Sequence, residues 1–228
     1  MAGAEPHINA MPTKAFFVDM LVKDIPLERA ILDLVDNCID GAKRLRPADE
    51  PDFTGLQVAL SLSGEEFVIE DNCGGFDVAT AQNYAFRFGR PSEAKSTDYS
   101  IGQFGVGMKR ALFKFGRYFE VHSTTQNQKW SMTVNVDDWE EAPEWVFDFD
   151  EIIEDQEFPL EDCGTRIIVR ELRPEVSSRF GGEYYRRQLS EMIRSHQRQL
   201  VAAGLAIQAD GTHRTNTELK IRTRRKVT

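Results

Sequence analysis

One stretch of the chain limits the possible folds more than any other, the segment over residues 27–46, which reads LERAILDLVDNCIDGAKRLR. At about 100° per residue its apolar side chains fall on a single stripe of a helix, and such a stripe faces a core. Pro26 stands just before it, at a helix start where a missing N–H does no harm. We therefore predict a long amphipathic helix whose core-facing residues are Leu27, Ile31, Leu34, Cys38, Ala42 and Leu45.

A second stripe on the same predicted helix carries polar groups. Asp33, Asn37 and Gly41 follow one another at spacings of four residues, with Asp36 and Asp40 beside them. Carboxylate and amide oxygens are the ligands through which proteins bind Mg²⁺ while the ion keeps waters and substrate phosphates. A solvated acidic helix face is the alternative interpretation. Gly41 favours the binding interpretation. A glycine inside a helix costs about 1 kcal/mol relative to alanine, and its presence indicates that something approaches the backbone closely.

The composition is that of a single soluble domain. At 228 residues and 41% hydrophobic content, the chain is large enough for a real core. We expect a flexible start over residues 1–12 and one domain over residues 13–228. No apolar run is long enough to span a bilayer, and the N-terminus lacks the pattern of a secretion signal. We therefore expect a cytoplasmic protein without membrane contact.

Several kinds of site are excluded by the sequence. Cys38, Cys73 and Cys163 lie far apart and form no CxxC pair, which argues against disulfides and zinc. The four histidines form no HExxH motif, and the chain has no GxSxG motif. The net charge is −9, and residues 137–162 hold thirteen acidic side chains and no basic one. Because such a segment repels phosphate backbones, we expect no nucleic-acid-binding surface.

Periodicity predicts the remaining elements. Helices are expected over residues 13–22, 77–86, 108–116 and 183–203, strands over residues 56–62, 66–70, 117–124, 130–136, 145–149 and 166–172, and a closing hairpin over residues 205–212 and 217–223. The strands come in hairpins and not as βαβ repeats. We therefore predict a two-layer α/β sandwich with a mixed, mainly antiparallel sheet covered on one face by helices.

Two glycine-rich turns stand out among the connections. Residues 71–76, DNCGGF, place an aspartate at the end of a predicted strand. Residues 102–107, GQFGVG, lead directly into a predicted helix, so that backbone N–H groups and the positive end of the helix dipole form an anion cradle. Phosphate is the expected anion, although glycine turns also serve packing. The spacing is neither that of a Walker loop nor that of the dinucleotide GxGxxG motif.

These motifs, taken in order, resemble the GHKL superfamily of ATPases, which includes gyrase, the heat-shock chaperones of the Hsp-ninety class, histidine kinases and MutL. Within it the chain looks closest to the MORC-like and prokaryotic chaperone-like branch. Residues 27–46, 69–76, 86–116 and 163–169 carry the resemblance. It implies a Bergerat-type ATP-binding fold with a mobile lid, ATP and Mg²⁺ as ligands, and a nucleotide-dependent homodimer. It also implies that the chain is the N-terminal part of a longer protein with downstream domains.

The resemblance assigns roles to individual residues. Asn37 matches the asparagine that coordinates Mg²⁺, and Asp71 matches the aspartate that accepts a hydrogen bond from the adenine amino group. Gly75 would let the base lie close to the backbone, and Thr165 would support the adenine end through its hydroxyl. Residues 102–107 match the phosphate-binding end of the lid.

The lid itself would span residues 86–101, and Ser92, Lys95 and Lys109 are expected phosphate contacts by position and charge. The complete set of expected ATP-binding residues is Asn37, Asp40, Gly41, Asp71, Gly75, Phe76, Ser92, Lys95, Gly102, Gln103, Phe104, Gly105, Val106, Gly107, Met108, Lys109 and Thr165.

The chain departs from the family pattern at two positions. The usual DxGxG motif has Cys73 in place of its first glycine. The general base of the hydrolysing members is a glutamate four residues before the asparagine, and this chain has Asp33 there. An aspartate is one methylene shorter, and a general base needs hydrogen-bond reach of about 2.6–3.2 Å to the attacking water.

Three functions are compatible with this pattern. The first is an ATP-dependent conformational switch with slow hydrolysis, in which Asp33 is the catalytic base. The second is a module that binds nucleotide without turning it over. The third is phosphotransfer of the histidine-kinase type, against which stand the carboxylate of Asp33 and the lack of a preceding phospho-acceptor helix.

Overall fold

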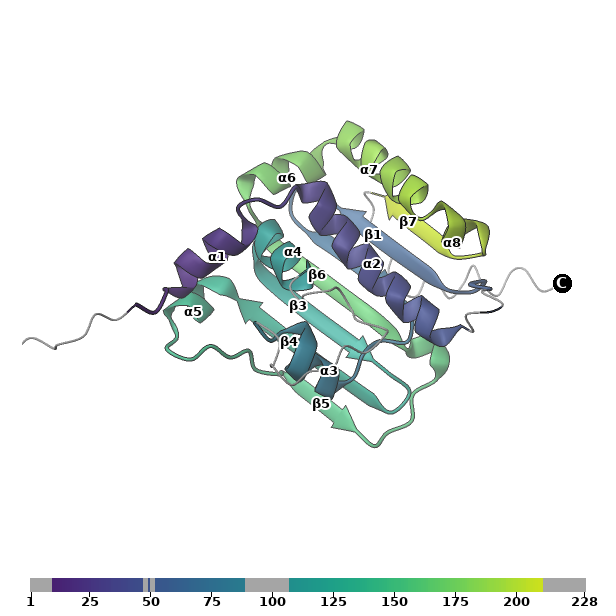
Figure 1. Ribbon diagram of the computed structural model, residues 1–228, viewed down its shortest axis with the longest axis horizontal. Coiled ribbons are helices and arrows are strands. Elements are labelled where there is room, and N and C mark those ends of the chain that lie inside the picture. The colour runs from purple at the N-terminus through teal and green to yellow at the C-terminus, as the bar shows by residue number, and fades with distance from the viewer. Residues whose placement is uncertain (1–9, 47–48, 50–51, 89–106, 211–228) are drawn as a thin grey trace, which may run out of the picture.

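A seven-stranded sheet with the order β5-β4-β3-β6-β2-β1-β7 forms the centre of the molecule (Figure 1). The structure is a computed structural model that describes residues 10–46, 49, 52–88 and 107–210. The strands are β1 Gln57–Leu62, β2 Phe67–Asp71, β3 Gly116–Thr124, β4 Gln128–Asn135, β5 Glu151–Glu154, β6 Gly164–Leu172 and β7 Ala206–Asp210.

Strand β6 joins two hairpins into one sheet. The β1–β2 and β3–β4 hairpins are antiparallel, and β6 lies between them, antiparallel to both β2 and β3. β5 extends the sheet antiparallel to β4, while β7 runs parallel to β1. The predicted mixed, mainly antiparallel sheet is therefore confirmed.

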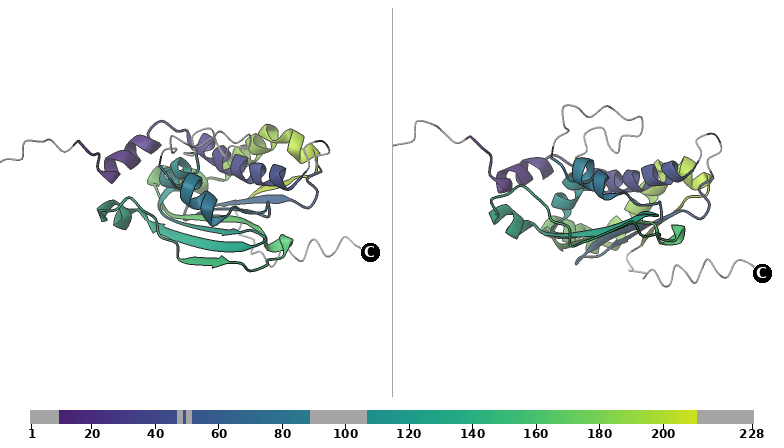
Figure 2. Two further views of the ribbon diagram at one scale, coloured as in Figure 1. Left: turned by 60° about the horizontal axis from the view of Figure 1, so that its bottom comes forward. Right: turned by 90° about the horizontal axis from the view of Figure 1, so that it is seen from below.

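Helices cover one face of this sheet, as the edge-on views of Figure 2 show for α2, α4 and α7. The helical elements are α1 Lys14–Val22, α2 Leu27–Leu45, α3 Val78–Thr80, the π-helical η1 Ala81–Ala85, α4 Gly107–Phe115, α5 Val136–Glu141, the 3₁₀ helix η2 Leu160–Asp162, α6 Pro174–Gly181, α7 Glu183–His196 and α8 Arg198–Ala202. This is the predicted two-layer α/β sandwich. None of the described helices has the length and apolar composition needed to cross a bilayer.

Helix α2 packs through the stripe that the sequence predicts. Leu27, Ile31, Leu34 and Ala42 are buried, and Leu45 near the helix end is half-buried. A fully buried leucine or isoleucine side chain stabilises a fold by about 1.5–3 kcal/mol. Several such residues outweigh the cost of one glycine in the helix. The orientation of α2 is therefore fixed by its apolar stripe, and its polar flank is held in place with it.

The turn after β2 lies directly against α2. A Cβ atom added at Gly41 would lie 2.8 Å from the carbonyl oxygen of Cys73, so the close approach expected at Gly41 is confirmed. The approaching group is the chain's own turn. Gly74 and Gly75 in this turn have φ angles of +88° and +63°, a region that favours glycine, whereas Cys73 needs no positive φ.

Helix α1 begins where the sequence predicts. The Thr13 hydroxyl accepts a hydrogen bond from the Phe16 backbone N–H at 3.3 Å and caps the helix. The buried Lys14 amine donates to the carbonyl oxygens of Trp139 at 2.6 Å, Ala142 at 2.8 Å and Glu144 at 2.6 Å. Because these carbonyls lie at the end of α5, one lysine holds α1 and α5 together.

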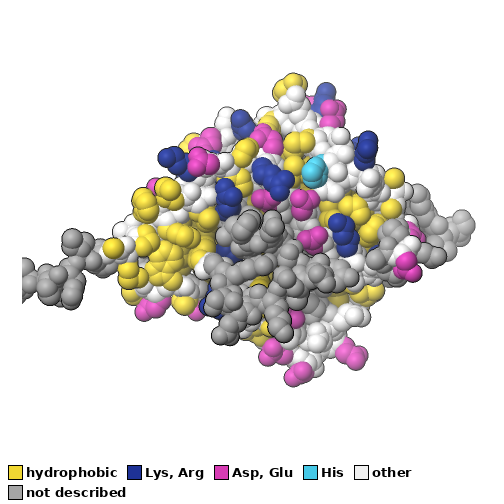
Figure 3. Space-filling view, viewed as in Figure 1, with side chains coloured by type: hydrophobic (Ala, Val, Ile, Leu, Met, Phe, Trp, Pro, Cys, Tyr) yellow, Lys and Arg dark blue, Asp and Glu magenta, His cyan; other side chains and the backbone are white. Residues whose placement is uncertain are grey.

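Apolar side chains gather on the surface around α1 (Figure 3). Phe16 is 59% exposed and Met20 is 56% exposed, while Val18 on the other side of the helix is buried. The exposure of these two large apolar side chains shows that the described part of the chain covers α1 on one side only.

One sequence prediction is wrong around the acidic segment, while the strand expected over residues 130–136 is confirmed as β4 at Gln128–Asn135. Residues 145–149 form no strand, and the edge strand is β5 at Glu151–Glu154. The aromatic residues that suggested a strand pack instead against a cluster that includes Phe86 and Trp130. The preceding strand ends at Asn135, because this side chain accepts from the N–H groups of Asp137 and Asp138 and starts α5.

The C-terminal part also differs from its prediction. The helix expected over residues 183–203 is interrupted at Gln197, where φ is −102° and ψ is 20°, and its amide donates to Asp36 Oδ1 at 2.7 Å. Helix α6 was not predicted. β7 pairs in parallel with β1, and the expected hairpin partner over residues 217–223 lies outside the described residues. Residues 78–85 are helical as expected, but as α3 and a π-turn.

Substitution of Gly41 by alanine tests the contact between α2 and the turn. Glycine to alanine in a helix usually stabilises by about 1 kcal/mol. Here the new Cβ would press on the Cys73 carbonyl, so Gly41→Ala should lower the free energy of unfolding by about 1–3 kcal/mol, measured by urea denaturation.

Gly181→Ala is the matched control, because the nearest atom to its new Cβ is Gly64 Cα at 3.8 Å. This variant should keep or slightly raise stability. Equal effects of the two substitutions would show that the turn yields easily and does not fix α2.

Candidate functional site

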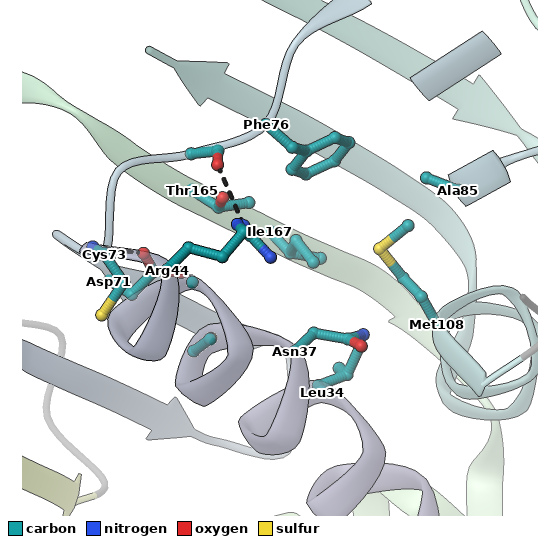
Figure 4. A pocket seen from close by; sticks show the side chains of 13 residues that line it. Leu34, Asn37, Arg44, Asp71, Cys73, Phe76, Ala85, Met108, Thr165 and Ile167 are labelled. Carbon is teal, nitrogen blue, oxygen red and sulfur yellow. Dashed lines mark hydrogen bonds between the residues drawn. The ribbon is translucent and has the colours of Figure 1, made fainter. Parts of the chain in front are cut away.

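A pocket lies between α2, the turn after β2, and strand β6 (Figure 4). About 510 Å³ of space lies among its lining residues, part of it open to solvent. Its lining residues are Leu34, Asn37, Cys38, Gly41, Arg44, Asp71, Cys73, Gly75, Phe76, Ala85, Met108, Thr165 and Ile167. The walls are mostly apolar, with a few polar groups.

The sheet brings Asp71 and Thr165 together. Asp71 ends β2, and Thr165 is its partner in the antiparallel register with β6. Ile167 lies two residues further along β6 and points to the same face, because side chains alternate along a strand. Two of the residues assigned to the adenine end, separated by more than ninety positions in the sequence, are thus neighbours in the pocket.

Asp71 is a buried carboxyl group with a fixed orientation. Only 9% of the residue is exposed, and its Oδ1 accepts the Cys73 backbone N–H at 2.7 Å. Burial raises the pKa of Asp71 from 3.8 to about 6, although this hydrogen bond and the Cys38 thiol act in the opposite direction. At neutral pH the group is mainly ionised and can only accept hydrogen bonds.

The turn that follows Asp71 is held by the sheet. The Ser123 hydroxyl accepts from the Phe76 N–H at 2.9 Å and donates to the Phe76 carbonyl at 3.1 Å. The Trp130 indole N–H donates to the same carbonyl at 2.8 Å. A Cβ at Gly75 would lie 2.3 Å from the Thr124 carbonyl oxygen. Gly75 therefore lines the pocket and also allows the turn to press against β3.

The phosphate end of the expected site lies further back along α2. Asn37 lines the pocket, and Asp33 lies one turn earlier, next to the start of α4. A Cβ on Gly107 would be 3.4 Å from Asp33 Oδ2. Asp33 Oδ1 also pairs with Arg29 Nε at 2.9 Å. Burial raises the pKa of Asp33 against the lowering effect of Arg29, which moves the carboxyl toward the range useful for a general base.

The arrangement fits a magnesium ion bound together with phosphates. Asn37 offers one amide oxygen to the pocket, and Mg²⁺ in nucleotide sites is held by one or two protein groups, waters and substrate oxygens. Within the described ranges, no three His, Cys, Asp or Glu side chains gather into a metal-binding group. Asn37 would therefore hold the ion together with the nucleotide.

Lys109 and Asp40 have surroundings that the sequence did not predict. The Lys109 amine donates to the carbonyl oxygens of Ala85 at 2.8 Å, Arg87 at 2.8 Å and Tyr84 at 3.4 Å, and burial lowers its pKa to about 8. It joins α4 to the end of η1 and does not line the pocket. Asp40 also lies outside the lining residues, and burial raises its pKa. The phosphate contact expected of Lys109 stays a prediction that requires this lysine to leave its carbonyls.

Part of the expected site cannot be placed. Ser92, Lys95, Gly102, Gln103, Phe104, Gly105 and Val106 lie outside the described residues, while Gly107 begins α4 and Met108 lines the pocket. Sequence reasoning missed the lining residues Leu34, Cys38, Arg44, Cys73, Ala85 and Ile167. Helical spacing was the signal available for Arg44, which lies three residues after Gly41 and seven after Asn37.

The buried carboxyl group gives a pH-dependent prediction. Because the native pKa of Asp71 is about 6, the native state keeps a proton that the unfolded chain releases above about pH 4. The contribution of Asp71 to stability should therefore fall by about 3 kcal/mol as the pH rises from about 4 to about 7.

Urea unfolding of the unaltered protein and of Asp71→Asn across this range measures the effect. The other titrating groups contribute equally to the free energy of unfolding of both proteins, so they cancel in the difference. The stability of the unaltered protein relative to the variant should decrease with rising pH. A constant difference would contradict the shifted pKa.

A family model described as "Histidine kinase-, DNA gyrase B-, and HSP90-like ATPase" matches residues 25–165. No curated protein matches the sequence. The matched region contains α2, the turn after Asp71, the start of α4 and Thr165, which are the parts from which the pocket is built. It also covers more than half of the chain. The chain therefore belongs to the histidine kinase-, DNA gyrase B- and HSP90-like ATPase family, and its domain is one that binds ATP.

Proposed function

We propose that the pocket binds ATP together with Mg²⁺ and that slow hydrolysis makes the domain a conformational switch. One observation supports this most strongly. Asn37 on α2 lines the pocket, Gly41 one turn later lies against the turn after Asp71, and Asp33 one turn earlier lies at the start of α4. Gly41 and Asp33 are about 12 Å apart along the helix axis. An extended nucleoside triphosphate fits this arrangement, with its base at Asp71 and its last phosphate near Asp33.

The base would be recognised by Asp71. Its carboxylate accepts the adenine amino group, and Thr165 beside it supplies a hydroxyl. Guanine and hypoxanthine carry a carbonyl oxygen at the position of that amino group, and two acceptors facing each other leave a buried polar group unpaired. Such mispairing costs about 1–3 kcal/mol.

Asp33 would act as the general base. Its carboxylate accepts a proton from a water that attacks the terminal phosphorus, the bond to the bridging oxygen breaks, and ADP and inorganic phosphate leave. The ion held by Asn37 supplies electrostatic stabilisation of the charge on the phosphate oxygens. Because aspartate reaches less far than glutamate, turnover should be slow.

A module that binds ATP without turnover is the second candidate. The ion pair between Asp33 and Arg29, at 2.9 Å, favours it, because one carboxylate oxygen is already engaged. Phosphotransfer of the histidine-kinase type is less well supported, since a carboxylate lies where those enzymes have no base.

Assembly and context stay predictions. The resemblance leads us to expect a nucleotide-dependent homodimer, closure of the lid, downstream domains and the MORC-like or chaperone-like branch. A cytoplasmic location is an expectation from the sequence pattern. The apolar surface of Phe16 and Met20 on α1 is compatible with a protein contact.

Substitution of Asp71 by asparagine tests recognition of the base. Asp71→Asn offers a donor to the adenine amino group, so ATP affinity should fall about tenfold or more by calorimetry. Inosine triphosphate, which has a carbonyl oxygen in place of the amino group, is the matched ligand. The unaltered protein should prefer ATP, and the variant should lose this preference. An unchanged ratio of the two affinities would remove Asp71 from the site.

Three substitutions on α2 separate binding from hydrolysis. Asp33→Asn should bind Mg-ATP nearly as well as the unaltered protein but release no phosphate, whereas Asn37→Ala should weaken the magnesium-dependent part of binding. Asp33→Glu should raise the rate if reach limits it, since a general base contributes about 10²–10⁴-fold.

Glu28→Gln is the control, because it removes a carboxylate charge from the same helix at a residue that pairs with Arg179 and does not line the pocket. Phosphate release measures the rates. Hydrolysis by Asp33→Asn at the unaltered rate would show that Asp33 is not the base. No hydrolysis by either the unaltered protein or Asp33→Glu would favour the binding module.

A further inference from the structure

Arg44 reaches across the pocket from the last turn of α2. It is a lining residue, and its Nη2 donates to the carbonyl oxygen of Gly75 at 3.4 Å (Figure 4). The residue is otherwise exposed. No role was assigned to it from the sequence, yet it is the cationic side chain among the lining residues.

The position of Arg44 argues against a contact with the phosphates of a bound nucleotide. Arginine most often pairs with phosphate. Arg44 lies seven residues after Asn37, about 10 Å further along the helix axis and away from Asp33 and the start of α4. It instead contacts the turn that follows Asp71. The guanidinium therefore lies at the end of the pocket where the base would bind.

Bracing the turn does not account for this side chain. The hydrogen bond to Gly75 is long, since N–H···O bonds are most often 2.9–3.0 Å. The next residue, Phe76, is already held by Ser123 and by the Trp130 indole at 2.8–3.1 Å. An exposed arginine with one long bond adds little to a turn fixed in this way, so its guanidinium is available to a ligand.

We propose that Arg44 contacts the base and ribose end of the bound nucleotide and covers the purine from the side opposite β6. This inference rests on the proposed ATP site and deepens it. Thr165 and Ile167 on β6 form one wall of the base end, and Arg44 extends from the facing wall. A planar guanidinium stacks on an aromatic face and still donates through its edge. The hydrogen bond to Gly75 engages one edge nitrogen of the guanidinium, Nη2.

Arg44 also acts on the carboxylate that reads the base. The titratable and charged groups that face Asp71 are the thiols of Cys38 and Cys73 and the guanidinium of Arg44. Burial raises the pKa of Asp71, and the charge of Arg44 works against this rise. Arg44 thus favours the ionised carboxylate that accepts the adenine amino group.

Calorimetric titration of Arg44→Gln with ATP and with adenosine tests the proposal. Loss of a stacked guanidinium should weaken both ligands by a similar factor, about tenfold. Lys43→Gln is the matched control, because it removes the same charge from the adjacent, exposed position, which does not line the pocket. It should bind both ligands as the unaltered protein does.

Two further measurements separate contact from structure. Arg44→Lys keeps the charge without the planar group, so its affinities should lie between those of the unaltered protein and Arg44→Gln. The pH at which ATP affinity falls on acidification should move upward in Arg44→Gln and stay in place in Lys43→Gln, because Arg44, unlike Lys43, is among the groups that oppose the raised pKa of Asp71.

Unchanged affinities in Arg44→Gln would overturn the proposal. So would a loss for ATP alone, which would make Arg44 a phosphate contact, or a matching loss of thermal stability, which would make it a brace of the turn. If the unaltered protein binds neither ligand, the proposed ATP site itself fails, which is a different result from binding that is insensitive to Arg44.

Discussion

The contact between α2 and the turn after β2 is the constraint on which the site depends. The apolar stripe of α2 fixes the helix on the sheet, and the absence of a side chain at Gly41 lets the Cys73 carbonyl lie against its backbone. A bulkier residue there would separate helix and turn. Asp71 would then move away from Asn37, and the pocket would lose the alignment of its two ends. Packing therefore sets the geometry of the polar groups.

Two buried lysines fix other contacts between elements of the fold. Lys14 donates to three carbonyls at the end of α5, and Lys109 donates to three carbonyls at the end of η1. A buried ammonium is costly unless it is hydrogen-bonded, so each lysine is stable only while its carbonyls stay in place. Phe88 connects these regions, since its ring lies 4.9 Å from that of Phe17 and under the Lys109 amine. Helix α1 is thus coupled to the start of α4 through an aromatic contact.

Much of the fold follows from local patterns in the sequence. The period of α2, the Thr13 cap, the alternation in β1 and the apolar run in β6 depend on neighbouring residues, and the structure has these elements where they were predicted. The insertion of β6 between two hairpins and the parallel pairing of β7 with β1 depend on contacts between distant residues. Alternating aromatics at residues 145–149 imitated a strand because they pack against a core edge.

The residues of the site also divide into those that sequence motifs predict and those whose place depends on contacts between distant parts of the chain. Asn37, Asp71 and Thr165 belong to motifs, and the structure brings all three to one pocket. Arg44 and Ile167 lie in the same segments but had no assigned role, and their place in the pocket follows only from the way helix and sheet meet. The contacts of Lys109 also could not be predicted, because they require the carbonyl groups at the end of η1 to lie within reach of its amine.

The most direct test of the central claim is a crystal structure of the domain with Mg²⁺ and a non-hydrolysable ATP analogue. We expect the adenine amino group at the Asp71 carboxylate, the metal ion at the Asn37 amide oxygen and the terminal phosphate between Asp33 and the start of α4. A nucleotide bound outside the pocket between α2 and β6, or bound with its phosphates at Asp71, would contradict this claim.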